Sequence, residues 1–385
     1  MQVDYGIRHY LDHASTSPIR PEALEAMNRW WNTDHGDPSR LHAEALTSRY
    51  EIEQARQQVA DFFGASSREV VFTSGATESI ATSVWGASAR GSHQVYSAVE
   101  HSAIQRSIEG LSTKADHHST VVRVDRFGLV DPEQMAAAIG NNTAVAHCQW
   151  ANHEVGTIQP VAEVVAACKQ RSPKVLIHVD AASAAGRVAI NFANSGADLM
   201  SISAHKFGGP TGVGALLVKR GLRLAPLLAG GEQERTRRGG LENGAAIAGF
   251  GAACASLNNG KLEQEAVQAE TQTQQLRLAV QDQHGLEVYG HPNHRLAHLL
   301  CLGIEDVVPG AVLIALDQAG VAAHSGSSCA SEAWEPSPVL EAMGVDAHHS
   351  LRFSVGWSTT HEDITIAAEA LGQALANLRR LKPSG

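Results

Sequence analysis

Two residues of this sequence lie where an apolar strand is predicted to end, and each side chain is chemically useful there. Lys206 follows the predicted strand 199–204 and precedes a Gly-Gly-Pro turn, so its amine can be desolvated and can form a Schiff base. Asp180 ends the predicted strand 174–181, where a poorly solvated carboxylate needs a cationic partner such as a protonated pyridine nitrogen. Taken singly, each residue keeps a structural alternative: for Lys206 a lysine in a surface loop, and for Asp180 an aspartate that caps the turn after its strand.

A third segment, Ser74-Gly75-Ala76-Thr77-Glu78, follows the predicted strand 69–73 and opens a helix. Small residues at a helix N-terminus expose backbone N–H groups that bind phosphate, although Thr before Glu is also an ordinary helix start. Together the three segments supply, in chain order, a phosphate cradle, a carboxylate for a ring nitrogen and an imine-forming lysine. That combination is far more specific than any one segment.

Alternating strands and helices must bring these segments together. Such alternation implies an α/β fold with a mostly parallel sheet, right-handed crossovers and ligands at the carboxyl ends of the strands. The predicted strands are 69–73, 94–99, 120–124, 143–150, 174–181, 199–204 and 213–219, and the helical segments between them include 76–90, 131–139 and 160–171.

The character of the sequence changes near residue 243. A long helix-like stretch runs from there to about 283, followed by strand-like segments at 286–290, 298–304, 321–326 and 350–356. We therefore expect a large domain over 15–245 and a smaller α+β domain built from 1–14 and 246–385. The helix-like segments 21–33 and 43–63 are expected to pack against one or both domains.

Composition excludes several classes of protein. With 385 residues, 18% of them charged, and a mean hydropathy of −0.14, the chain is neither disordered nor membrane-like. A net charge of −10 argues against direct nucleic-acid binding. The histidine pairs 117–118 and 348–349 are adjacent residues that point apart, so no metal site is expected. No signal-peptide segment is evident, and we expect a cytoplasmic protein without a membrane partner.

The five cysteines are odd in number and widely scattered, so a reactive one is expected to act as a free thiol. Cys329 lies among small residues in the segment 325–331, which gives a thiol access and mobility. The other four have apolar or helical neighbours and are expected in the core; they are Cys148, Cys168, Cys254 and Cys301.

With these segments in place, the sequence resembles the group I cysteine desulfurases of the class V aminotransferase family, which are fold-type I pyridoxal-phosphate enzymes. The resemblance covers nearly the whole chain. It implies a large domain with a mostly parallel seven-stranded sheet and a smaller α+β domain that carries the catalytic cysteine. The matching segments include YLDHAST (10–16), VEHSAI (99–104), ANHEVGTIQP (151–160), SAHKFGGPTGVGAL (203–216), SGSSCAS (325–331) and LRFSVG (351–356).

The resemblance implies pyridoxal 5′-phosphate as the cofactor and a role for each matching residue. Lys206 would attach the cofactor covalently and move protons, and Asp180 would hold its ring nitrogen. His101 would stack on the ring and help with the proton of the substrate thiol. Arg352 would bind the substrate carboxylate, and Cys329 would take the sulfur as a persulfide. The phosphate would be bound by Ala76, Thr77, Ser203 and His205.

Four positions depart from the family's pattern. His153 stands where the family has Asn, and Ser183 where it has Gln, both near the cofactor's 3-hydroxyl. Leu241 replaces a phosphate-binding Thr that the partner subunit usually supplies. Asp37 replaces an Asn near the substrate carboxylate, which its charge would repel. These changes bear on substrate, cofactor affinity or rate rather than on the fold.

The activity that the resemblance implies is conversion of L-cysteine to L-alanine, with a persulfide on Cys329 passed to an acceptor such as an iron–sulfur scaffold or a thiolation protein. A homodimer is also implied. Two alternatives stay open: a pyridoxal-phosphate-dependent C–S β-lyase acting on another sulfur amino acid, and a catalytically weak relative that relays sulfur. The retained Lys206, Asp180, His101, Cys329 and Arg352 argue against the weak relative.

Overall fold

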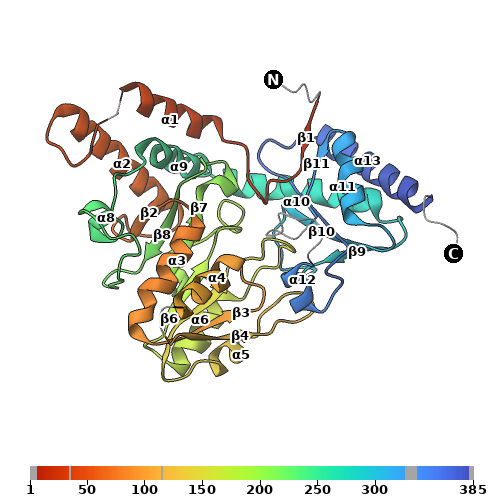
Figure 1. Ribbon diagram of the computed structural model, residues 1–385. Helices are drawn as coiled ribbons and strands as arrows, with labels where there is room; N and C mark the ends of the chain where they lie inside the picture. Colours follow the sequence, from red (N-terminus) through yellow and green to blue (C-terminus); the bar gives the residue numbers. More distant parts are fainter. Residues whose placement is uncertain (1–6, 34–35, 114–115, 326–335, 381–385) are drawn as a thin grey trace.

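The computed structural model describes residues 7–33, 36–113, 116–325 and 336–380, and its largest element is a seven-stranded sheet (Figure 1). The strand order is β2-β8-β7-β6-β5-β3-β4, and only β8 runs antiparallel to the other six strands. The predicted α/β fold with a mostly parallel seven-stranded sheet is confirmed. The strands are β2 (Val70–Thr73), β3 (His93–Ser97), β4 (His118–Val122), β5 (Thr143–Gln149), β6 (Leu176–Asp180), β7 (Leu199–Ser203) and β8 (Gly214–Val218).

Different helices cover the two faces of this sheet, which explains why its strands are apolar on both sides. In β6, Ile177 and Val179 belong to the buried cluster shared with α1 (Pro21–Thr33), α2 (Ala43–Phe62) and α6 (Val161–Arg171). Leu176 belongs to a separate cluster with Ala87 of α3 (Ala76–Ala87). The remaining helices along these strands are α4 (Ser102–Ser112), α5 (Pro132–Ala137), α7 (Phe192–Ser195) and the 3₁₀ helices η1 (Ser88–Arg90) and η2 (Ala204–Phe207).

A second, antiparallel sheet is formed by the C-terminal part of the chain and lies beside the first (Figure 1). Its order is β12-β10-β9, and its buried cluster includes side chains of α10, α11 and α13. The N-terminal β1 (His9–Tyr10) joins this part by pairing with β11 (Val321–Ala322). The elements are β9 (Leu286–Tyr289), β10 (Leu299–Ile304), β12 (Ser350–Ser354), α10 (Lys261–Val280), α11 (Pro309–Gln318), α12 (Pro338–Met343) and α13 (His361–Arg380).

One sequence expectation in this part was wrong, and a second holds only for part of its range. The long helix expected from 243 to 283 is two helices, α9 (Gly244–Ser256) and α10, because Asn259 and Gly260 adopt left-handed φ angles of 59° and 82° between them. Within the strand expected at 321–326, the described residues 321–325 pair at β11 and at an isolated bridge between His324 and Arg352.

The domain division near residue 245 stays a prediction, and α9 shares the buried cluster of α1 and α2. No helix in the described part of the chain has the length and apolarity that crossing a bilayer requires.

A buried ion pair fastens the loop that follows β8. Arg56 of α2 makes two 2.7 Å hydrogen bonds to the carboxylate of Glu234, which lies in α8 (Gln233–Thr236). The N–H of Phe72 also donates to this carboxylate, at 2.9 Å. Glu234 and the next two residues have positive φ angles, an unfavourable conformation for non-glycine residues. The bidentate pair therefore offsets local backbone strain.

We expect Glu234→Gln to lower the free energy of unfolding by about 3–5 kcal/mol, because the buried Arg56 would lose its charged partner. Glu53 contacts the same guanidinium at 2.9 Å, but its side chain is 49% exposed. Glu53→Gln is therefore the matched control and should cost less than about 1 kcal/mol. Denaturant unfolding of both variants checks this, and equal losses would contradict it.

Candidate active site

One cavity of about 400 Å³ gathers most of the predicted site residues. It opens where β2, β3, β5, β6 and β7 end, at the edge of a parallel sheet where ligands commonly bind. The predicted residues that line it are Ala76, Thr77, His101, His153, Asp180, Ser183, Ser203, His205, Lys206 and Arg352.

The N-terminus of α3 forms one end of the cavity. Gly75 precedes the helix with a φ of +148°, a conformation that favours glycine, and no side chain from the described residues caps the helix there. The first N–H groups of α3 can therefore serve an anion. Glu78 lies in the same turn, but Arg238 pairs with it at 3.0 Å and the N–H of Ser74 donates to it at 2.8 Å. This end of the cavity suits a phosphate.

The Lys206 amine lies at the centre and donates to two backbone carbonyls, those of Ala14 at 2.6 Å and Ser15 at 3.1 Å. Burial, with a further contribution from Arg352, lowers the pKa of Lys206 to about 8. An appreciable fraction of the amine is therefore uncharged near neutral pH. Only an uncharged amine can attack a carbonyl carbon.

Asp180 lies opposite Gln149 in the register of β5 and β6, and its Oδ1 accepts the N–H of Ala182 at 3.0 Å. Burial raises its pKa, while His153 and Lys206 favour its charged form. Glu100 is nearby, and burial raises its pKa to about 8, with Asp180 contributing. Glu100 is thus protonated near neutral pH, which leaves the negative charge to Asp180. A buried carboxylate of this kind suits a cationic ring nitrogen.

His101 has two roles in the structure. It caps α4, because its Nδ1 accepts the N–H of Ala103 at 3.1 Å, and it also lines the cavity. Burial, then His153 and Lys206, lower its pKa to about 3, so the ring is neutral. With Nδ1 accepting, its proton is on Nε2. The ring of His153 lies 5.1 Å away, edge to face.

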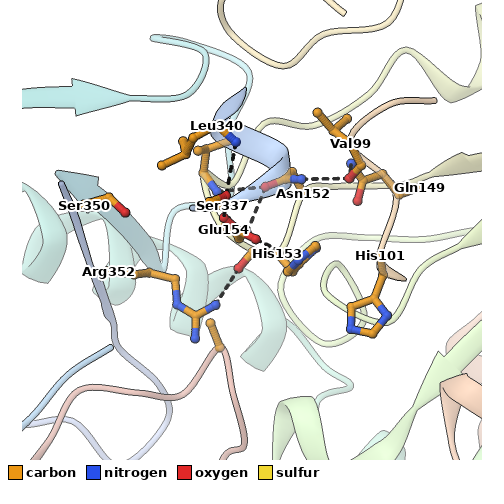
Figure 2. A network of polar contacts seen from close by, with 12 residues as sticks. Val99, His101, Gln149, Asn152, His153, Glu154, Ser337, Leu340, Ser350 and Arg352 are labelled. Carbon is orange, nitrogen blue, oxygen red and sulfur yellow. Dashed lines mark hydrogen bonds and ion pairs between the residues drawn. The ribbon is translucent and has the colours of Figure 1, made fainter. Parts of the chain in front are cut away.

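Arg352 is buried and lines the same cavity. It donates to the carbonyl of His153 at 2.9 Å, to Asp12 at 3.0 Å and to the hydroxyl of Ser15 at 2.7 Å. Its Nε is buried and has no hydrogen-bond partner among the described residues. Figure 2 shows the guanidinium beside the segment 152–154. Three of the five N–H groups of this guanidinium are thus used within the protein.

Two predicted positions, Asp37 and Leu241, do not line this cavity, and a third, Cys329, cannot be placed relative to it. The carboxylate of Asp37 bonds the N–H and hydroxyl of Ser39 and pairs with Arg40 at 3.2 Å, away from the lining residues. Leu241 is 63% exposed and lines a neighbouring cavity that shares Ser74 and Gly212 with the first. Cys329 lies outside the described residues, whereas the other four cysteines are buried free thiols as expected.

Sequence reasoning missed residues that act through the predicted ones. Asp12 and Ser15, the partners of Arg352, lie in the YLDHAST segment, but nothing local indicates their contact with a residue more than 300 positions away. Glu100 immediately precedes His101, and an acidic residue at the end of an apolar strand was a usable signal. Gln149 could have been predicted as a lining residue, because it is the last residue of β5 and the alternation of side chains along a strand gives its direction.

The sequence profile of the class-V aminotransferases matches residues 9–366. The chain belongs to the class-V aminotransferase family. It is 36% identical over 383 residues to a cysteine desulfurase IscS of Dictyoglomus turgidum, an alignment that covers 97% of this chain and 96% of the relative. A NifS-like protein of known structure superposes with a TM-score of 0.90 at 28% identity, covering 97% of this chain and 100% of the other. SspA in complex with cysteine superposes with a TM-score of 0.79 at 28% identity, covering 90% and 98%.

Pyridoxal 5′-phosphate is the cofactor of this family, and the cavity fits it. The uncapped N-terminus of α3 suits the phosphate, the buried carboxylate of Asp180 suits the ring nitrogen, and the desolvated amine of Lys206 suits covalent attachment. Residues of all three features line one cavity.

The lowered pKa of Lys206 predicts how cofactor uptake depends on pH. Covalent attachment by the cofactor-free protein should accelerate as pH rises and level off above about 8, where the amine is uncharged. In Arg352→Gln the midpoint should move to higher pH, because a neighbouring positive charge is removed. Visible absorbance of the attached cofactor reports the rate. A midpoint near the ordinary lysine value, or one that Arg352→Gln leaves in place, would contradict the account.

Proposed function

We propose that this protein is a cysteine desulfurase, which converts L-cysteine to L-alanine and keeps the sulfur as a persulfide on Cys329. The observation that supports it best is the gathering of a desolvated lysine, a buried aspartate and a buried arginine around one cavity. The 36% identity to a cysteine desulfurase across nearly the whole chain supports the choice of substrate.

Each part of the cavity has a task in holding the cofactor. The N–H groups of Ala76 and Thr77 would bind the phosphate together with Ser203 and His205. Asp180 would keep the ring nitrogen protonated, and Lys206 would carry the covalent attachment. His153 and Ser183, which line the cavity, would lie near the 3-hydroxyl of the cofactor.

When bound, pyridoxal 5′-phosphate supplies an electron sink that makes the substrate Cα–H acidic and weakens the Cβ–S bond. The uncharged amine of Lys206 takes the proton from the substrate Cα. Arg352 holds the substrate carboxylate, with Asp12 and Ser15 fixing the guanidinium in place. His101 is neutral and carries its proton on Nε2, so it can share in proton transfer at the substrate sulfur.

The sulfur leaves by nucleophilic attack of the Cys329 thiolate on the sulfur of the substrate. An S–S bond forms as the Cβ–S bond breaks, and the electron pair of that bond stays with the three-carbon skeleton. That skeleton takes up protons and leaves as alanine, so one cysteine and one thiol give one alanine and one persulfide. An acceptor thiol then takes the outer sulfur by exchange.

The partners are part of the same proposal. A homodimer would place Leu241 of each subunit near the phosphate end of the other, where the family usually has a hydroxyl. An acceptor protein, an iron–sulfur scaffold or a thiolation protein, would receive the sulfur. Reduced thiols are needed throughout, which favours a cytoplasmic location.

The test is to incubate the cofactor-loaded protein with L-cysteine and to measure alanine and protein persulfide together. We expect both to form in equal amounts in the first turnover, with the persulfide on the peptide that contains Cys329. Cys329→Ala should reduce alanine formation by at least about 100-fold, while cofactor absorbance is unchanged. Cys301→Ala alters a buried thiol and is the matched control.

Other products would overturn the proposal. Pyruvate and ammonia in place of alanine would identify a C–S β-lyase. Full alanine formation by Cys329→Ala would remove this thiol from the reaction. Absence of visible cofactor absorbance would favour a protein that only relays sulfur.

A further inference from the structure

Arg20 holds the backbone of the turn that carries Lys206. Its Nε donates to the carbonyl of Phe207 at 2.7 Å, and its backbone N–H donates to the carbonyl of Gly208 at 2.8 Å. Gly208 has a φ of +94°, and a Cβ atom on it would lie 2.5 Å from Cγ of Arg20. The Arg20 side chain therefore lies directly against this backbone, at the two residues that follow Lys206.

The two carbonyls before these are held in the same way. The carbonyl of Lys206 accepts a guanidinium N–H of Arg187 at 2.9 Å, and that of His205 accepts the N–H of Ser17 at 2.9 Å. Four consecutive carbonyls, 205–208, thus bond to groups outside the turn. The turn itself is the short 3₁₀ helix η2, a conformation whose internal hydrogen bonds have poorer geometry than those of an α-helix. Its position is therefore set largely by these outside donors.

An ion pair fixes the Arg20 guanidinium in turn. Its two Nη atoms bond to the two carboxylate oxygens of Glu265 in α10, at 2.7 and 2.6 Å. The Arg20 side chain is 1% exposed and that of Glu265 15%. The guanidinium carbon also lies 5.7 Å from the centre of the Trp357 ring. A bidentate pair fixes the plane of a guanidinium, and so the direction in which its Nε–H points. Glu265 is thus linked through Arg20 to the carbonyl of Phe207.

The same N-terminal segment contacts the other end of the Lys206 side chain. The amine donates to the carbonyls of Ala14 and Ser15, a few residues before Arg20. One segment, 14–20, therefore contacts the amine and also holds the backbone from which the amine extends. A shift of η2 relative to this segment would move the amine within the cavity.

We infer that Arg20, held by Glu265, positions the Lys206 amine for covalent attachment of the cofactor. Arg20 acts through the backbone of the turn, so it is a positioning residue. The inference rests on attachment of the cofactor to Lys206, which is part of the proposed function, and not on the reaction with cysteine. Misplacement of a reacting group by about 1 Å can lower a rate about 100-fold. Loss of the contact should therefore slow attachment, while the N-terminus of α3 still binds the phosphate.

The test uses the full-length protein after removal of the cofactor and follows its uptake of pyridoxal 5′-phosphate by visible absorbance. Attachment joins the Lys206 nitrogen to the aldehyde carbon of the cofactor and releases one water. Varying the cofactor concentration separates a half-saturating concentration, which reports initial binding, from a limiting rate, which reports attachment. We expect Glu265→Gln to lower the limiting rate about tenfold or more and to leave the half-saturating concentration within about twofold.

A double variant removes the ion pair without leaving a buried charge. Arg20→Met combined with Glu265→Leu introduces two apolar side chains of similar size, and such replacements often leave stability unchanged. Its limiting rate should also fall about tenfold or more, with a melting temperature close to that of the wild type. The pH midpoint of attachment should stay at its wild-type value, because the contact acts on the position of the amine and not on its charge.

Another buried ion pair, far from the cavity, supplies the matched control. Asp198 accepts a hydrogen bond from Lys169 at 2.5 Å and from the N–H of Ile177 at 2.9 Å, and its side chain is 9% exposed. It directly precedes β7, whose other end, at Ser203, lines the cavity. Asp198→Asn leaves Lys169 without its charged partner, so it should lower the melting temperature more than the double variant does. Its limiting rate should equal that of the wild type.

Two results would overturn the inference. A wild-type limiting rate in the double variant would mean that the pair only joins α10 to the N-terminal segment. A pH midpoint displaced as far as in Arg352→Gln would mean that the pair acts on the charge of the Lys206 amine.

Amide hydrogen exchange of the cofactor-free protein is a second readout. Exchange in 204–209 should rise in the double variant and stay unchanged in Asp198→Asn, and unchanged exchange in both would overturn the role of Arg20 as an anchor. Alanine and persulfide play no part in these readouts, so a failure of the reaction with cysteine leaves them intact. Attachment of the cofactor to a lysine other than Lys206 would reject both the inference and that part of the proposed function.

Discussion

The Lys206 amine has to be buried beside a guanidinium, and much of the structure follows from that requirement. Such an amine loses its charge more easily than a solvated one, so its pKa falls to about 8. It donates its hydrogen bonds to the carbonyls of Ala14 and Ser15, near the N-terminus of the chain. The N-terminal segment must therefore close over the sheet. The β1–β11 pair holds that segment at one side, and the Arg20–Glu265 ion pair, with oxygens at 2.6–2.7 Å, holds it at the other.

Charges around this amine are paired so that few are left for a ligand. Asp12 neutralises Arg352 in part, Arg238 neutralises Glu78, and Glu100 keeps its proton. Asp180 remains as a buried carboxylate whose pKa is raised by burial and opposed by His153 and Lys206. The groups whose charge is not fully neutralised within the protein thus match charged groups of the family's cofactor or of an amino-acid substrate.

The fold could be predicted from the sequence further than the site could. Strands buried on both faces are continuous apolar runs, so β5, β6 and β7 were found. Asp180 is the last residue of β6, and Lys206 lies in η2, which follows β7. The break between α9 and α10 was missed because helical pattern continues on both sides of the left-handed Asn259. Partners of Arg352 and the pKa of Glu100 depend on tertiary burial, which no local pattern encodes. The roles of Asp37 and Leu241 come from resemblance alone.

The central claim is that Lys206 attaches the cofactor, and borohydride reduction followed by peptide mapping tests it most directly. Reduction of the cofactor-loaded protein fixes the attachment as a stable secondary amine on the lysine that carries it. The account predicts one pyridoxyl group per chain, on the peptide that contains Lys206, and none in Lys206→Ala. A label on another lysine, or an unlabelled Lys206 in a protein that shows cofactor absorbance, would contradict it.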